Sequence, residues 1–437
     1  MSGPLTEDAA DAEDAEDAED AADAREAGRA SSLWRNRDFN LLWTGQCLSD
    51  VGSAMSDLAL PLLVFQLTGS PTQAGLVGTA GLAVATTCRL PAGVLVDRFD
   101  RRRLMILCDV VRLVVYAALA CAVVAGKATL ALILVVVAGS AAASVVFTTA
   151  EFAAVRSLVR PDQLVTAVAR NEARSYGSSL AGPPLGGLLF GLGRALPFLG
   201  NALSFLLSLS ALLCIRRPLQ QPRPDPASDP ASVPASVPGG TWWQGPRFVL
   251  GNPFLRSLIV IAAPLNMAFT GMIFALTISL RRSGLPPVLV GLVTMTIGVG
   301  GLLGAFTAPA LQRRLRLPTL IRVICWSTAA LMALSVLLST GIAAAVPLAV
   351  AVFLGPAANA ALFGYQAAVT PDHLQGRVVS VVLLAATSAT ALAPALAGVL
   401  LSHVAGRTAM LAFPLLVVAA AVVATFGGGI RSMSRRP

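Results

Sequence analysis

Between two long apolar runs of the chain lies the basic stretch Gly93-Val-Leu-Val-Asp97-Arg98-Phe-Asp100-Arg101-Arg102-Arg103. The first run ends at Asp97, and the second begins at Leu104. An apolar run of about 20 residues can cross a bilayer as a helix. A short loop rich in Arg stays on the cytoplasmic side. The stretch therefore predicts a membrane protein and the direction in which it faces.

The composition of the 437-residue chain supports this prediction. It is 55% hydrophobic and only 13% charged, whereas a soluble domain is about 25% charged. Eleven of its 23 acidic residues lie between Glu7 and Glu26, a low-complexity segment for which we expect disorder. The Arg residues fall mostly in short loops between apolar runs, which indicates topology rather than nucleic-acid binding. We therefore expect a lipid bilayer, and no nucleic acid, as the partner.

The apolar runs number twelve, in two groups of six around a proline-rich stretch, and each is long enough to span. The fold class predicted is an all-α membrane protein with twelve transmembrane helices in two six-helix halves. The expected helices cover residues 39–67, 73–96, 102–125, 128–150, 163–191, 196–215, 254–280, 287–311, 318–340, 343–366, 374–402 and 408–430. The expected domains are an acidic tail (1–32), a first bundle (33–216), a cytoplasmic linker (217–250), a second bundle (251–430) and a basic tail (431–437).

Loop charge and a weak internal repeat support this organisation. Most Arg residues lie in loops on one side, which places both termini in the cytoplasm, with Arg281 and Arg282 as the exception. The segment 159–164 matches the segment 369–374 in the other half. Parallel repeats of this kind occur in transporters that bind substrate near the midplane between the halves.

The pattern Gly-x-x-x-Asp-Arg-x-x-Arg-Arg in the basic stretch resembles the loop between helices 2 and 3 of major facilitator superfamily transporters. The resemblance implies a gate, in which Asp97 lies at the start of helix 11 when the inside is closed. A carboxylate is favoured at a helix N-terminus, and a glycine permits close helix approach. The alternative is a loop that only sets topology. The predicted gating residues are Gly93, Asp97, Arg98, Arg101 and Arg102.

A second motif lies on the fifth predicted helix, Gly182-Pro183-Pro184-Leu185-Gly186-Gly187. It resembles a motif that accompanies exporters exchanging substrate for protons in the same superfamily. Ser178 stands where the family pattern has a further glycine. Pro bends a helix and Gly permits tight packing, so the alternative is a kink with no bearing on direction. The residues predicted to matter are Gly182, Pro183, Gly186 and Gly187.

Charged residues inside membrane helices are expensive and usually functional. Asp50 and Asp57 are seven residues apart and share one face of the first helix. A desolvated carboxylate can carry a proton, which makes both candidates for proton coupling; the alternative is cation binding in a wet cavity. Asp109 is a third candidate, although its i,i+3 spacing to Arg112 favours a structural ion pair.

For four other charged residues of the first half, the sequence predicts a pairing or a position rather than a role in transport. Arg89 is a possible partner of Asp50 or Asp57. The residues Glu151, Glu172 and Arg174 are expected at the interface, near the cytoplasmic ends of helices 4 and 5.

After Asp229, the only acidic residue of the second half is Asp372, in a loop. A carboxylate-based proton step must then use the first half. Flexible and aromatic side chains with a few polar groups suit a bulky, mostly apolar ligand, although helix packing is the alternative for each. The substrate-binding candidates are Asn266, Met267, Phe269, Tyr365 and Gln366.

No enzyme motif is present, and no P-loop, so we expect neither catalysis nor a cofactor. The six Cys residues lie in apolar runs without ligand spacing, and no metal site is expected. Residues 33–430 resemble the drug- and macrolide-efflux branch of the superfamily, on the runs 33–46, 58–70 and 194–198. The hypothesis is proton-coupled export of a hydrophobic or amphipathic small molecule by a monomer in the cell membrane. The alternatives are an uptake symporter, a lipid flippase, or a transport-inactive membrane sensor.

Overall fold

The computed structural model describes residues 33, 36–160, 163–216, 219–220, 244–314, 317–339, 341–371 and 374–426. Every regular element in these ranges is a helix. The acidic tail, the basic tail and most of the predicted linker lie outside the described residues. The predicted domain boundaries stay a prediction.

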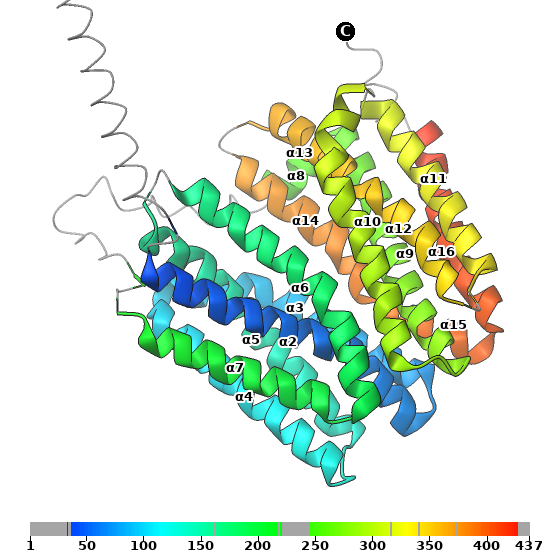
Figure 1. Ribbon diagram of the computed structural model, residues 1–437. Coiled ribbons are helices and arrows are strands. Elements are labelled where there is room, and N and C mark those ends of the chain that lie inside the picture. Colours follow the sequence, from blue (N-terminus) through cyan, green and yellow to red (C-terminus); the bar gives the residue numbers. More distant parts are fainter. Residues whose placement is uncertain are drawn as a thin grey trace, which may run out of the picture.

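The first half contains six long helices that pack as one group. Helix α2 packs against α6 and α7, and α4 and α5 pack against each other, with α3 beside α5. Figure 1 shows this group from blue to green, on one side of the molecule. The helices are α2 (Arg37–Thr68), α3 (Pro71–Arg98), α4 (Arg101–Val124), α5 (Leu130–Leu158), α6 (Leu164–Leu192) and α7 (Leu196–Cys214).

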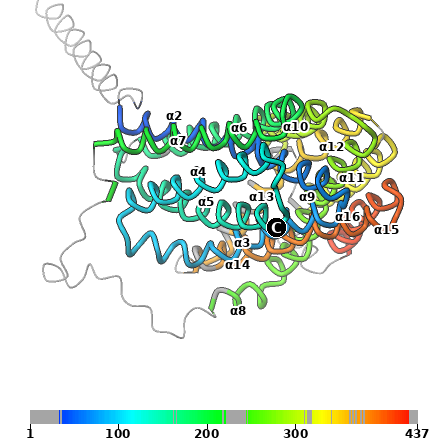
Figure 2. Tube along the Cα trace, turned by 90° about the horizontal axis from the view of Figure 1, so that it is seen from below, coloured from blue at the N-terminus to red at the C-terminus, as the bar shows by residue number. Residues whose placement is uncertain are grey.

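The second half packs beside the first. In Figure 2 most of its helices lie to the right of α2, α4 and α7, while α14 lies next to α3, which it contacts. Helix α9 packs against α14 and α16, and α10 packs against α12. The elements are α8 (Gln244–Gly251), α9 (Pro253–Arg282), α10 (Pro287–Arg314), α11 (Leu317–Leu337), η3 (Ile342–Ala344), α12 (Ala345–Phe353), α13 (Gly355–Val369), α14 (Gln375–Ala391), α15 (Ala393–His403) and α16 (Gly406–Phe426).

Two of the predicted helices of the second half are broken. Helices α12 and α13 meet at Leu354, and α14 and α15 meet at Leu392. Each break is followed by a proline in the first turn of the next segment. Proline has no backbone N–H and its ring clashes with the preceding turn, which explains the breaks. The short amphipathic helix α8, in the predicted linker, is an element that the sequence analysis did not predict.

Eleven spans among the described residues are long and apolar enough to cross a membrane. Each broken pair counts as one span, and the twelfth long helix is α6. It is as long as α5, at 29 residues, but carries Arg170, Glu172 and Arg174 in its first three turns. The prediction of an all-α membrane fold is confirmed. In the first half the helix ends lie within two residues of the predicted ones, except that α5 continues eight residues beyond its predicted end, to Leu158.

Local sequence explains how the basic loop turns. Asp100 caps α4, because its carboxylate accepts a hydrogen bond from the Arg103 backbone N–H at 2.8 Å. Asp is a preferred N-cap residue.

At the other end of α3, the preceding turn depends on a glycine, because Gly69 ends α2 with a φ of 65°. That left-handed conformation is easy only for glycine.

The halves meet mainly at two crossings, α3 with α15 and α6 with α10, and α3 also contacts α14. We call the end of the molecule with the connections after Thr68 and Arg282 the distal end, and the end where α2 begins the terminal end. At the distal end the crossings are tight. A Cβ on Gly187 would lie against the Pro287 backbone, and one on Gly398 against the Pro71 backbone.

At the terminal end the same helices separate. The exposed fraction of Phe306 on α10 is 76%, and a Cβ on Gly177 of α6 would meet nothing within 4 Å. A gap of about 380 Å³ lies there between α6 and α10, next to both residues. The protein is therefore closed at the distal end and parted at the terminal end.

Candidate functional site

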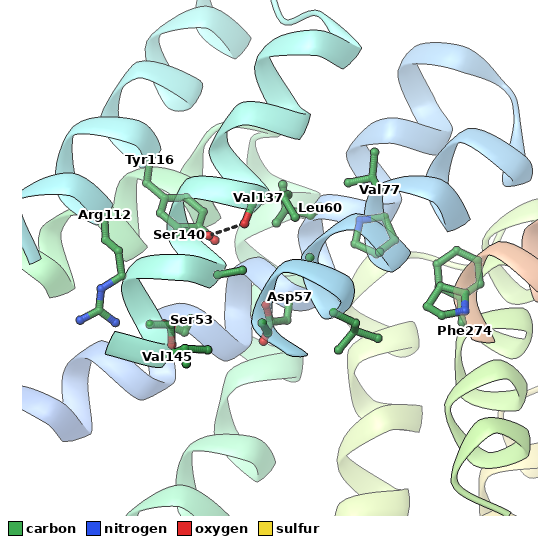
Figure 3. Close-up of a pocket in the computed structure, with 18 of the residues that line it drawn as sticks. Ser53, Asp57, Leu60, Val77, Arg112, Tyr116, Val137, Ser140, Val145 and Phe274 are labelled. Atoms are coloured by element: carbon green, nitrogen blue, oxygen red, sulfur yellow. Dashed lines mark hydrogen bonds between the residues drawn. The ribbon is translucent and has the colours of Figure 1, made fainter. Parts of the chain in front are cut away.

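The main cavity lies between the two halves and measures about 490 Å³. Most of its wall comes from the first half, including Asp57 and Tyr116, and Phe274 and Pro394 of the second half close it. Figure 3 shows Asp57 near its centre, with Tyr116 and Phe274 on opposite sides. A second cavity of about 350 Å³ shares the following residues with the first: Asp57, Pro61, Thr270, Phe274 and Pro394.

Asp57 is the acidic residue at the junction of these cavities. It lies in the middle of α2, and its side chain is exposed to the cavity. Within the described part of the chain, no side chain forms an ion pair or hydrogen bond with its carboxylate. A lone carboxylate at membrane depth requires water, a proton or a cation to offset its charge.

Asp50, two turns earlier on α2, has a different environment. Arg174 Nε lies 2.9 Å from Asp50 Oδ2, and the other two guanidinium nitrogens bind Glu151 at 2.7 and 3.2 Å. The side chains of Arg174 and Glu151 are 8% and 6% exposed, and that of Asp50 is 32% exposed. These three residues form a charged triad that joins α2, α5 and α6 and has a net charge of −1.

The triad corrects two expectations. Arg174 and Glu151 are buried rather than interfacial, because each neutralises the other inside the bundle. Arg89 is exposed on α3, and Asp50 pairs with Arg174 instead. Glu172 is exposed on α6.

The predicted ion pair on α4 is confirmed. Arg112 contacts Asp109 at 2.5 Å, and both side chains are nearly inaccessible to solvent. The second Asp109 oxygen accepts a hydrogen bond from Ser208 at 2.6 Å, and Ser208 accepts one from Gln46 at 2.8 Å. The Arg112 guanidinium lies between the rings of Phe147 and Phe205, at 4.6 and 4.4 Å. The cluster joins α2, α4, α5 and α7, and a proton-coupling role for Asp109 stays a prediction.

The sequence pattern of the Major Facilitator Superfamily matches residues 42–394, which is most of the chain. The chain belongs to the Major Facilitator Superfamily. The members of this family to which it can be compared are transporters, and the two halves with a cavity between them agree with that class.

Among sequence relatives of this major facilitator chain is the multidrug efflux pump Tap of Mycolicibacterium fortuitum. The two are 28% identical over 399 residues, which is 87% of this chain and 93% of the pump. Among solved structures, a bacterial homolog to the human lysosomal transporter Spinster, inward-facing and unoccupied, matches with a TM-score of 0.73 and 16% identity over 93% of this chain and 99% of that one. An inward-facing bacterial homologue of the iron transporter ferroportin matches with a TM-score of 0.66 and 17% identity over 93% and 100%.

The superfamily loop motif lies at the terminal end. Asp97 and Arg98 are exposed in the last turn of α3. Arg101 donates to the Ala153 carbonyl at 3.2 Å, so it is bound to the last turns of α5. Arg102 donates to the Leu212 and Leu213 carbonyls at the end of α7, at 3.3 and 3.0 Å. These two Arg residues therefore join the loop to neighbouring helix ends.

The close approach predicted at Gly93 is absent in this conformation. Among the described residues, nothing lies within 4 Å of a Cβ built on it. The terminal end is where the halves have parted, which explains the open space. The gate role of Asp97 concerns the opposite conformation, and it stays a prediction.

The motif on α6 lies where three helices cross. A Cβ on Gly182 would meet Ala54, and one on Gly186 would meet the Met55 backbone, both on α2 beside Asp57. A Cβ on Gly187 would meet the α10 backbone of the other half. Pro183 lines the second cavity. The motif therefore joins the helix that carries Asp57 to the crossing between the halves.

The five substrate-binding candidates lie outside the lining of both cavities. Asn266 is exposed and donates to the Ala262 carbonyl of its own helix at 2.9 Å. Met267 and Phe269 are half-buried on α9. Tyr365 packs edge to face on Phe254, with ring centroids 4.5 Å apart. Gln366 is buried on α13. Binding by these residues stays a prediction.

The lining residues that the sequence analysis missed are on the next turns of α9. Thr270, Phe274 and Thr277 follow one another at helical spacing and line one or both cavities. This i, i+4, i+7 pattern was visible in the sequence. Its orientation toward the other half was not, because both faces of α9 are apolar.

Proposed function

We propose that this major facilitator protein is a proton-coupled exporter of hydrophobic or amphipathic small molecules, with both termini in the cytoplasm. The observation that carries the proposal is the cavity shared by both halves, with the carboxylate of Asp57 at its centre and no partner for it among the described residues. In this orientation the terminal end faces the cytoplasm, and the cavity is reached from that side.

The chemistry of the cavity supports this choice. Aromatic and aliphatic side chains such as Phe274, Tyr116 and Val77 form most of its wall. Such a wall suits apolar surface, and a few polar groups orient the ligand. Asp57 can hold a proton or the positive charge of a ligand, and it cannot hold both. Competition for this carboxylate couples the movement of the two species in opposite directions.

Alternating access follows from the geometry of the crossings. The distal end is closed by glycine contacts, and the terminal end has parted. Rocking of the two halves would open the distal end and close the terminal one. Asp57 lies on the helix that packs against Gly182 and Gly186 of α6, so its charge state can influence that movement. Export, rather than uptake, is favoured by the α6 motif and by the relationship to a multidrug efflux pump.

The test is transport by cells that express the full chain. Ethidium and erythromycin serve as probes, with and without an uncoupler of the proton gradient. Wild type should lower the accumulation of at least one probe, and the uncoupler should abolish this effect. The Asp57→Asn variant should accumulate that probe like cells with empty vector, at equal expression.

The matched control is Asp100→Asn, because Asp100 caps α4 far from the cavity and Asn caps a helix equally well. It should export like wild type. Full export by Asp57→Asn would exclude Asp57 as the coupling site. If cells with wild type instead accumulate a probe and the uncoupler prevents this, the protein imports the probe and the proposed direction of transport is wrong.

A further inference from the structure

The break in the eleventh membrane helix lies against α3 at the distal end. A Cβ on Gly75 would lie against the Pro394 carbonyl, and one on Gly78 against the Pro394 ring. Pro394 also lines both cavities. The break is therefore both part of the crossing between the halves and part of the cavity wall.

The break leaves a backbone donor outside the helical hydrogen-bond ladder. Pro394 has no N–H, and the regular ladder resumes with the Leu396 N–H, which donates to the Leu392 carbonyl at 3.0 Å. Between them, the Ala395 N–H donates to Thr79 Oγ1 at 3.0 Å. The acceptor belongs to α3 of the other half. Thr79 thus does for α15 what an N-cap residue does within one helix.

Other polar contacts accompany this bond at the same crossing. Thr72 Oγ1 lies 2.7 Å from Ser402 Oγ, two turns further toward the distal end. At the other crossing, between α6 and α10, the contacts that the described residues show are apolar and backbone contacts at Pro183 and Pro287. Among the described residues, the side-chain hydrogen bonds between the halves at the distal end therefore lie at the α3–α15 crossing. A cation–π contact between Arg282 of α9 and Phe65 of α2, at 5.8 Å, accompanies them.

We infer that Thr79 is a positioning residue that caps α15 across the two halves and thereby stabilises the conformation closed at the distal end. The inference rests on the alternating access of the proposed function. It adds a residue that shifts the equilibrium between the two conformations toward the one closed at the distal end. When the distal end opens, the Ala395 N–H loses its acceptor and must be hydrated. The halves can therefore part there only as water enters.

Hydrogen–deuterium exchange of the full-length protein in detergent tests this inference without any substrate. Thr79→Val removes the acceptor and keeps the shape of the side chain. Loss of one such bond should raise the population open at the distal end about fivefold. Exchange should then rise in peptides covering 71–80 and 393–402, and it should fall or stay constant in peptides at the terminal end, such as 93–103.

Two control variants complete the test. Thr79→Ser keeps the hydroxyl and should exchange like wild type. Thr86→Val lies two turns along α3, where the hydroxyl donates to Leu82 of the same helix at 2.8 Å, and it should also behave like wild type. A rise in exchange at the distal end without a rise at the terminal end is the signature of a conformational shift.

Three results would overturn the inference. They are unchanged exchange in Thr79→Val, equal exchange in Thr79→Val and Thr79→Ser, and a rise at both ends, which would indicate general loosening. None of them depends on transport. A protein that exports neither probe can still show the exchange response, so failure of the proposed function remains distinguishable.

Discussion

Replacement of Arg174 by Gln tests whether this residue stabilises the first bundle by neutralising Asp50 and Glu151. The change removes the only cation in contact with Asp50 and Glu151 among the described residues, so the triad charge falls from −1 to −2. Glu151 is 6% exposed and keeps a buried charge without a partner. Breaking a buried pair in this way costs about 3–5 kcal/mol of unfolding free energy. Asp50→Asn, by contrast, leaves a neutral Arg174–Glu151 pair and should cost less than about 1 kcal/mol.

The assay is thermal unfolding of purified protein in detergent, followed by intrinsic tryptophan fluorescence at one heating rate. For a bundle of this size, the loss in Arg174→Gln corresponds to a fall in apparent Tm on the order of 10 °C. The double variant Arg174→Gln with Glu151→Gln should recover most of this fall, because the remaining Asp50 is partly exposed. Glu172→Gln is the matched control, since Glu172 is exposed on the same helix.

Two results would refute the reasoning. If Arg174→Gln unfolds at the wild-type temperature, the triad does not hold the bundle together. If Asp50→Asn is as damaging as Arg174→Gln, charge balance is not the cause of the loss.

Two further substitutions test the crossing between the halves and the basic loop. Gly291→Ala places a Cβ against the Pro183 carbonyl, and this overpacking should lower the free energy of unfolding by about 1–3 kcal/mol and reduce export, although Ala favours a helix. The control Gly191→Ala, whose Cβ meets nothing within 4 Å, should change neither stability nor export. Equal behaviour of the two variants would contradict the tight crossing. Arg102→Gln removes a cation from the end of α7 and should lower the unfolding free energy by about 0.3–1 kcal/mol. The exposed Arg103→Gln should leave apparent Tm unchanged, and a larger fall in Tm for Arg103→Gln than for Arg102→Gln would contradict the stabilising role of Arg102.

The fold was predictable because its main signal is local. Each apolar run has a length that suits the bilayer, and the Arg residues of the 93–103 loop predict the direction in which the chain faces. The Asp109–Arg112 pair was predictable for the same reason, because i,i+3 spacing places both side chains on one face of a helix.

The Asp50–Arg174 pair was not predictable, because its partners are 124 residues apart and meet only when α2 and α6 pack. The helix break at Leu392 was equally hidden, since Pro394 sits in a long apolar run that reads as one span. The lining of the cavity by Thr270 and Phe274, rather than by Asn266, depends on the rotation of α9. In a membrane helix an apolar face can point to lipid, to a neighbouring helix or into a cavity, so the sequence does not show which face of α9 meets the other half.

The low hydropathy of α6 has a consequence for how the protein enters the membrane. This helix carries Arg170, Glu172 and Arg174, and it is less apolar than the eleven spans that meet the criterion for crossing a membrane. Both partners of Arg174 lie on helices that precede α6 in the chain, Asp50 on α2 and Glu151 on α5. During synthesis both neutralising carboxylates therefore leave the ribosome before α6 does. The order of the helices along the chain allows the most polar span to be inserted by docking onto its neighbours rather than by partitioning alone into lipid.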